Sequence, residues 1–221
     1  MNYTFPFSTC ESGVTIKGHP SQPFSALINF VSVCILFGLC FVKRKPVIIP
    51  LTIASYMLLE AWHGYSHAIH IKNTDLQFII IHCINYFAVF MTMLCVQLLT
   101  KKNMWIEWLI LIIAFIIELV FFIKRKKDQY SVIGGTLLFL LVGILSFRFL
   151  PINSQKFAIS AGIVFMIGIV FFVLEFLYCQ SWMKKFKFPY HIIIELLTMI
   201  FLILVSMTLV KINNLKKKSL Y

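Results

Sequence analysis

Acidic residues are scarce in this sequence, and several common motifs are missing. The 221 residues include eight Asp and Glu against 20 Lys and Arg. The six cysteines form no CxxC pair, so the pattern is neither a zinc ribbon nor a disulfide framework. No basic stretch is long or interleaved with aromatic residues, and we expect no nucleic acid as a partner. The first 20 residues lack an apolar core, so we expect no cleavable signal peptide.

Hydrophobic residues dominate instead. They make up 60% of the chain, which has 23 Phe and a mean hydropathy of +0.91. These values are typical of a polytopic membrane protein. The apolar stretches have the ~17–25 residues that a helix needs to cross about 30 Å of hydrocarbon. The stretches are residues 24–42, 47–71, 76–99, 105–123, 131–147, 157–179 and 190–210.

We therefore predict an all-α fold, a single domain of residues 1–221 formed by a bundle of about seven transmembrane helices. A polar N-terminal arm, residues 1–23, precedes the first helix, and a basic, frayed C-terminal tail, residues 211–221, follows the last. If the N-terminus lies outside or in a lumen, the inner side of the membrane holds slightly more Lys and Arg. The positive-inside rule therefore favours that orientation of a multi-pass protein.

The second predicted span contains a stripe of ionisable residues. Its members are spaced by three, four and three residues, so that they share one face of a helix. They are Glu60, His63, His67 and His70. Each ionisable side chain at the centre of a membrane helix costs at least ~2.5–3.5 kcal/mol. A stripe that only hydrogen-bonds to neighbouring helices is one explanation, but this cost favours a functional site. His63 and His67 are one turn apart, a spacing at which two imidazoles share a metal.

A second pair of candidate ligands begins the last predicted span. His191 and Glu195 are four residues apart and share a helix face. Even-numbered spans run towards the N-terminal side of the membrane and odd-numbered spans run away from it. The pair therefore lies at the depth of the second span's histidines. Together the two groups predict a metal site of four ligands, or of three ligands and a water. Imidazole and carboxylate suit zinc, with iron and manganese as alternatives.

Other polar residues fall at the same end of the predicted bundle, whereas its other half is almost entirely Leu, Ile, Phe and Val. We expect a polar chamber on the N-terminal side, with the second, third and seventh spans supplying most of its nitrogen and oxygen atoms. Glu107 is the lone acid towards the opposite end, where it favours the dipole of its helix. The further residues of the chamber are Asp75, His82, Glu118 and Glu175.

Several short motifs occur in a familiar order. Cys10-Glu11 precedes the first span, and Asn29-Phe-Val-Ser32 lies within it. Ser66-His-Ala-Ile-His70 ends the second span, Asp75 begins the third, and His191-Ile-Ile-Ile-Glu195 begins the seventh. These motifs resemble those of the superfamily of seven-helix membrane hydrolases that includes the alkaline ceramidases and the progestin/adipoQ receptors. At the first two places the alkaline ceramidases have Trp-Cys-Glu and Asn-Thr-x-Ser. At the other places the family has Ser-x-x-x-His, Asp and His-x-x-x-His.

The chain departs from this family pattern at three points. Glu195 replaces the last histidine of His-x-x-x-His, and a carboxylate also binds zinc. The family's His-to-Asp separation fits His63, whereas its Ser-to-His spacing fits His70, so both histidines stay candidates. The acidic residues that bind calcium in ceramidases are mostly missing, with Gly13 and Ala26 at expected ligand positions. This argues against calcium, and also against ceramide itself as the substrate.

The resemblance implies a hydrolase in which a zinc-activated water attacks an amide or ester bond of a membrane lipid. It gives Asp75 the role of base or proton shuttle and Ser66 the role of oxyanion stabiliser. The candidate metal ligands are His63, His67, His70, His191 and Glu195.

Two other classes of function stay open. Proton or metal-ion transporters and channels also use buried His and Glu residues. Against that class, we expect no polar path beyond Glu60, the deepest residue of the stripe. A receptor-like seven-helix protein that retains the residues of the site without catalysis is the other alternative.

Overall fold

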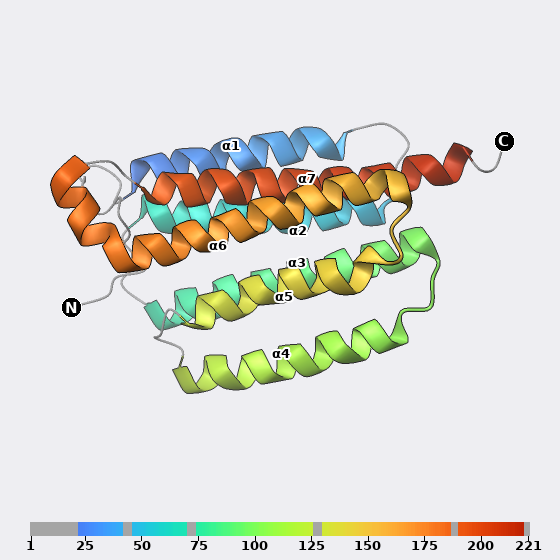
Figure 1. Cartoon of the computed structure of the whole chain (residues 1–221), viewed down its shortest axis with the longest axis horizontal. Helices are drawn as coiled ribbons and strands as arrows, with labels where there is room; N and C mark the ends of the chain where they lie inside the picture. Colours follow the sequence, from blue (N-terminus) through green and yellow to red (C-terminus); the bar gives the residue numbers. More distant parts are fainter. Residues whose placement is uncertain (1–21, 42–45, 70–73, 126–129, 187–189, 219–221) are drawn as a thin grey trace.

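The computed structural model describes residues 22–41, 46–69, 74–125, 130–186 and 190–218. These ranges contain helices and no strand, which confirms the all-α prediction (Figure 1). The N-terminal arm lies almost entirely outside the described residues. The helices are α1 (Pro23–Cys40), α2 (Ile48–Ala68), α3 (Thr74–Thr100), α4 (Trp105–Arg125), α5 (Tyr130–Phe147), α6 (Ile152–Phe186) and α7 (His191–Lys218).

The first five helices agree with the predicted spans to within a few residues, but the last two are longer. α6 continues to Phe186, and α7 continues to Lys218 through most of the segment predicted to be a frayed tail. That part of the prediction was wrong because it took the end of the apolar stretch as the end of the helix. Lysine is a good helix former, so a helix can continue beyond its apolar segment with its charges in solvent.

Five helical segments in the described residues are long and apolar enough to cross a membrane, which makes the chain an integral membrane protein. α2 has 21 residues, but Glu60, His63 and His67 lower its hydropathy, and it is not among the five. The described apolar part of α5 is only Leu137–Phe147. The five segments are Pro23–Cys40, Ile79–Thr100, Trp105–Lys124, Ile152–Glu175 and His191–Asn213.

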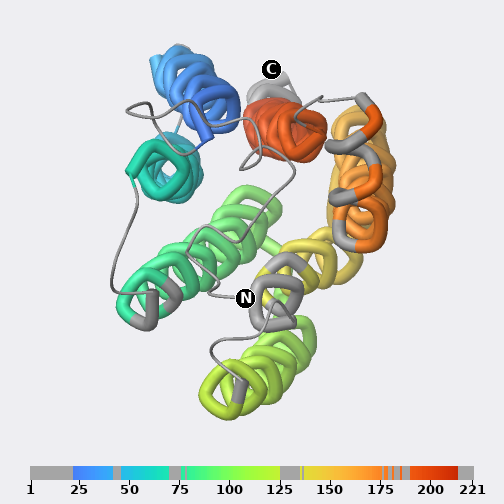
Figure 2. Tube along the Cα trace, turned by 90° about the vertical axis from the view of Figure 1, so that its left-hand side faces the viewer, coloured from blue at the N-terminus to red at the C-terminus, as the bar shows by residue number. Residues whose placement is uncertain are grey.

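The helices run up and down along one long axis (Figure 1). α1 packs on α2 and α7, α6 packs on α7, and α4 packs on α5. Seen from its end, the bundle has α1, α2, α6 and α7 on one side, α3 and α5 in the middle, and α4 on the far side (Figure 2). Because connected helices are antiparallel, α2, α4 and α6 end where α1, α3, α5 and α7 begin. This is the left-hand end in Figure 1.

Apolar side chains cover the outside of the bundle. On α4, Ile106, Ile110, Ile113, Ile117 and Phe121 are exposed along one helical stripe. Many polar side chains, in contrast, are buried between helices, which is the reverse of a protein in water. Lipid offers no hydrogen bonds, so polar groups are satisfied by neighbouring helices and apolar groups face the hydrocarbon.

At the opposite end of the bundle, Glu107 has a partner that the sequence did not reveal. Arg148, which directly follows α5, forms an ion pair with the buried Glu107 carboxylate at the start of α4. The guanidinium also lies 4.7 Å from the centre of the Phe149 ring. The pair connects the first turn of α4 to the end of α5.

Helices α1 and α2 approach each other closely at Gly64. A Cβ atom built on Gly64 would lie 2.9 Å from the Cβ atom of Asn29, closer than real Cβ contacts. Small residues allow such close helix approaches in membranes. The contact brings the polar face of α1 against the polar face of α2.

We predict that Gly64→Ala destabilises the protein by about 1–3 kcal/mol, because the added methyl group forces α1 and α2 apart. Thermal unfolding of the purified protein in detergent measures the effect. Gly38→Ala is the matched control, since a Cβ atom at Gly38 meets nothing within 4 Å. Equal melting temperatures for the two variants would contradict the close approach of the helices.

Candidate metal centre

Two histidines of α2 and one glutamate of α7 form a compact cluster. The His67 Nε2 atom lies 3.2 Å from Glu195 Oε1, and the His63 Nδ1 atom lies 3.8 Å from Glu195 Oε2. One ligand atom from each residue falls within 4.8 Å of the others. Two ligands at ~2.0–2.1 Å from a tetrahedral zinc ion are about 3.3 Å apart. The cluster therefore has nearly the dimensions of a metal site.

The helices explain why these residues meet. His63 and His67 are one turn apart on the same face of α2, near its end, and their ring centres are 4.5 Å apart. Glu195 lies in the second turn of α7, which begins at that end of the bundle. Because α2 and α7 are antiparallel and in contact, the end of one helix meets the start of the other.

His191 adds a third imidazole next to the same carboxylate. It lies one turn before Glu195 on α7, with its Nε2 atom 2.8 Å from Glu195 Oε1. The ring centres of His191 and His67 are 5.2 Å apart. His191 thus either orients the Glu195 carboxylate or supplies a fourth ligand.

The remaining ring nitrogens of His67 and His191 have partners of their own. Gln22 Oε1 is hydrogen-bonded to His67 Nδ1, and the Gln22 backbone N–H donates to the His67 carbonyl at 3.1 Å. Glu175 Oε2, from α6, lies 2.9 Å from His191 Nδ1. Each ring therefore directs its Nε2 atom towards Glu195. Metal-bound histidines commonly have this arrangement, in which an oxygen acceptor holds the nitrogen that does not bind the metal.

Asn29 of α1 completes the surroundings of the carboxylate. Its Nδ2 atom donates one hydrogen bond to Glu195 Oε2 at 3.0 Å and another to the Ser25 carbonyl at 2.9 Å. The second bond holds the amide against its own helix. Glu195 is thus contacted from α1 and α2 as well as from its own helix.

The centre is buried on all sides but one. The side chains of His67 and Glu195 are 0% and 2% exposed, whereas the side chain of His63 is 32% exposed. His63 is therefore the most accessible member of the cluster. Catalytic zinc sites keep one coordination position open, while structural sites are closed.

The predicted site residues differ in where the structure places them. It brings His63, His67, His191 and Glu195 together. His70 lies outside the described residues. Asp75 is the second residue of α3, and its side chain is not among those described.

Ser66 is buried, and its hydroxyl donates to the Trp62 carbonyl of the same helix at 2.8 Å. The predicted roles of His70, Asp75 and Ser66 stay predictions.

The surroundings of the cluster differ from the expected chamber. α1 and α6 contribute through Gln22, Asn29 and Glu175. Of these, only Glu175 was expected at this end as an ionisable residue. Gln22 directly precedes the proline that begins α1, a position typical of a helix start, but this does not mark it as the partner of a histidine.

At this end of the bundle, His82 and Tyr86 of α3, the third predicted span, have partners on α4. The His82 ring of α3 stacks on Phe122 of α4, with ring centres 4.2 Å apart. The Glu118 carboxylate of α4 accepts a hydrogen bond from Tyr86 of α3. Both residues lie at the predicted end of the bundle, but they connect α3 to α4.

The expectation that no polar path continues beyond Glu60 stays a prediction, although the structure places hydroxyl groups between the helices there. One turn deeper on α2, the Tyr56 hydroxyl is 2.6 Å from Thr92 Oγ1, which donates to the Ala88 carbonyl at 2.7 Å. Tyr56 is an amphipathic residue that the sequence alone does not distinguish from an aromatic core residue. The hydrogen bonds end at a backbone carbonyl, which cannot take part in a proton relay as a hydroxyl does.

No protein-family model matches this chain, and neither a curated protein nor a solved structure matches it. The fold and the cluster therefore define its class by themselves. The chain is an integral membrane protein, helical in the part that the structure describes, with a buried histidine–glutamate cluster that could hold a metal ion.

We predict that the purified protein binds about one zinc ion per chain and that Glu195→Gln abolishes this binding, because an amide is a much poorer ligand than a carboxylate. Elemental analysis after dialysis measures the metal content. Glu118→Gln, a matched change of another buried glutamate, should leave it unchanged. Chelation should also lower the melting temperature of the wild type, since bound metal adds to stability by mass action. A folded, metal-free wild type would contradict the prediction.

Removing the oxygen acceptors behind the histidines should weaken metal binding without abolishing it. We expect Gln22→Ala and Glu175→Ala each to lower zinc affinity about 10–100-fold, because the imidazoles lose their fixed orientation. Competition with a coloured chelator measures the affinity. Gln97→Ala removes a glutamine that accepts a hydrogen bond from Trp108 and serves as the control. Unchanged affinity in both test variants would mean that these contacts are only structural.

Proposed function

We propose that this protein is an intramembrane, metal-dependent hydrolase, with zinc as the metal, that cleaves an amide or ester bond of a membrane lipid. The observation that carries the proposal is the cluster of His63, His67 and Glu195, which is buried except beside His63. Two imidazoles and one carboxylate are a known ligand set of catalytic zinc, with the fourth position left to water. Zinc in such a site activates water and polarises a carbonyl group.

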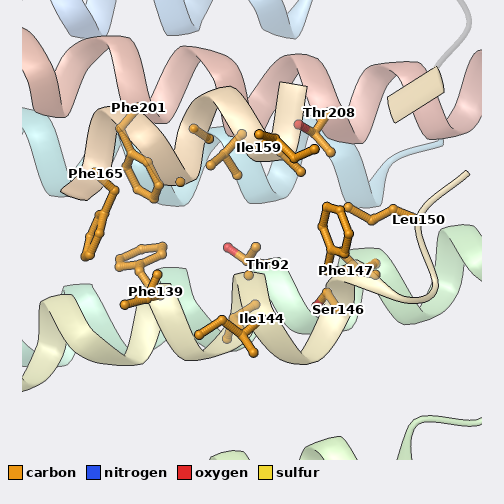
Figure 3. Close-up of a pocket in the computed structure, with 18 of the residues that line it drawn as sticks. Thr92, Phe139, Ile144, Ser146, Phe147, Leu150, Ile159, Phe165, Phe201 and Thr208 are labelled. Atoms are coloured by element: carbon orange, nitrogen blue, oxygen red, sulfur yellow. The ribbon is translucent and has the colours of Figure 1, made fainter. Parts of the chain in front are cut away.

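An apolar cavity of about 250 Å³ supports a lipid as the substrate. It lies between α5 on one side and α6 and α7 on the other, with α3 behind (Figure 3). Phe139 faces Phe165 and Phe201 across it at one end, and Leu150 lies at the other. The cavity is elongated along the helices, a shape that suits an alkyl chain.

The few hydroxyl groups of the cavity wall already donate hydrogen bonds within the protein. Thr92 donates to the Ala88 carbonyl, Thr208 donates to the Leu204 carbonyl at 2.8 Å, and Ser146 donates to the sulfur atom of Met93 at 3.6 Å. The wall therefore offers methyl and ring surfaces and no free donor. This chemistry favours hydrocarbon over a polar headgroup.

The cavity begins a short distance from the metal centre along α7. Phe201 lines its near end, six residues after Glu195, which corresponds to about 9 Å along a helix. A lipid whose carbonyl group lies at the centre can thus extend its chain into the bundle. In this proposal α2 and α5 also cross the membrane, giving seven spans with the N-terminus outside, and the polar face of α2 is shielded by α1 and α7.

A panel of long-chain N-acyl amides and esters tests the proposal. Wild-type protein in lipid nanodiscs should release fatty acid, detected by mass spectrometry. A chelator should stop the release and added zinc should restore it, while Glu195→Gln should be inactive. Zinc-loaded wild type that cleaves nothing on the panel would favour the receptor-like alternative. Ion flux into proteoliposomes that depends on the cluster would favour transport.

The cavity makes a separate prediction about chain length. Gly143 and Gly162 line it, and a Cβ atom at either position meets nothing within 4 Å. We expect Gly162→Leu to fill the cavity and to lower turnover of long-chain substrates by about tenfold relative to short-chain ones, as loss of one or two buried methylene contacts would. Gly38→Leu, also at an open position, is the control. An unchanged ratio of long-chain to short-chain turnover would mean that the acyl chain of the substrate binds outside this cavity.

A further inference from the structure

Glu60 differs from the other glutamates whose side chains the structure describes. It is 1% exposed, and neither carboxyl oxygen has a hydrogen-bond partner among the described residues. Every other described glutamate has a partner. Glu107 pairs with Arg148, Glu118 with Tyr86, Glu175 with His191, and Glu195 with His67 and His191. A buried carboxyl group without a partner is costly, and this cost calls for an explanation in terms of function.

The position of Glu60 connects it to the metal centre. It lies one turn before His63 on the face of α2 that carries His67, so it lines the inner side of the cluster. The Glu195 carboxylate is close enough to repel a charge on Glu60. Glu60 therefore shares the electrostatic environment of the centre without touching a ligand in the described structure.

Ser32 of α1 faces Glu60 in an unusual way. Several other buried hydroxyls in this bundle donate to the carbonyl four residues earlier, as those of Thr52 and Ser206 do. The Ser32 hydroxyl lies beside the Glu60 carboxyl group, and the two groups are not within hydrogen-bonding geometry of each other. A water molecule bound between the two groups would give each of them a hydrogen-bond partner.

The charges of the site also favour an ionised Glu60 when metal is bound. A divalent ion with Glu195 and neutral histidines has a net charge of one positive unit. One further carboxylate makes the set neutral, which the low dielectric of the membrane interior favours. When a proton moves from a water molecule at the centre to Glu60, the total charge of this set stays zero. The proton and the hydroxide that it leaves behind both remain within the set.

We propose that Glu60 is the proton acceptor and donor of the hydrolytic reaction, a role that rests on the proposed hydrolase function. The attacking water gives a proton to a Glu60 carboxylate oxygen, and the water oxygen bonds to the substrate carbonyl carbon. The bond from that carbon to the leaving nitrogen or oxygen then breaks. Glu60 returns its proton to the leaving atom, so that fatty acid and amine or alcohol are the products. The family resemblance gives this role to Asp75, and the described geometry assigns it to Glu60.

Glu60→Gln, measured at saturating zinc, tests this role with three readouts. Turnover of amides and esters on the lipid panel should fall about 10²–10⁴-fold with little change in KM, because an amide cannot accept the proton. Zinc should still bind at about one ion per chain. The melting temperature of the metal-free protein should not fall, because neither oxygen of Glu60 has a hydrogen bond to the described residues that the variant could lose. Glu60→Asp should recover part of the activity, and Glu118→Gln should behave as wild type.

The outcomes separate the two proposals. If the zinc-loaded wild type cleaves nothing, the hydrolase function fails and the role of Glu60 fails with it. If the wild type is active and Glu60→Gln matches it while Asp75→Asn is inactive, the hydrolase stands and the proton acceptor is Asp75. If Glu60→Gln melts well below the wild type in the metal-free state, Glu60 is a structural residue and the proposed role is wrong.

Discussion

The buried Glu195 carboxylate is the constraint on which the polar half of this protein depends. A charge inside a membrane bundle needs partners, and three helices supply them directly, while a fourth acts through His191. His63 and His67 come from α2, Asn29 from α1 and His191 from α7, while Glu175 of α6 holds His191 in turn. Replacing any one of these helices would leave a charged or polar group without a partner in hydrocarbon. The cluster therefore orients the helices as much as the helices position the cluster.

The two ends of the bundle have different roles in this arrangement. At one end polar groups from α1, α2, α6 and α7 meet, and the absence of a side chain at Gly64 allows α1 and α2 to approach closely there. Towards the other end an apolar cavity separates α5 from α6 and α7, and its hydroxyl groups are bound to the protein. A molecule with one reactive polar group and a long apolar chain fits this division better than a hydrated ion, which would need polar groups along its whole path.

Helix α2 carries both a feature that the sequence predicts and one that it does not. The spacing of His63 and His67 correctly predicted that both would face the same partner, because the geometry of a helix fixes the relation between residues four apart. The motif spacing that favoured His70 depends on the residues just past the end of the helix, and helical periodicity gives no information there. The same residues that form the cluster lower the hydropathy of α2, so the helix that carries both histidines is not among those apolar enough by composition to cross a membrane.

The sequence by itself determined the class of protein, the number and order of the helices, and the end of the bundle at which His191 and Glu195 meet the histidines of α2. Helix length, periodicity and the alternation of direction are local or topological properties, and these suffice for such predictions. Only the tertiary structure decided which oxygen faces which nitrogen. Gln22 and Asn29 are ordinary polar residues until α1 packs against α2 and α7. Glu60 stands apart only once every other described glutamate is seen to have a partner, because a missing contact is a property of the packed bundle and not of any one helix.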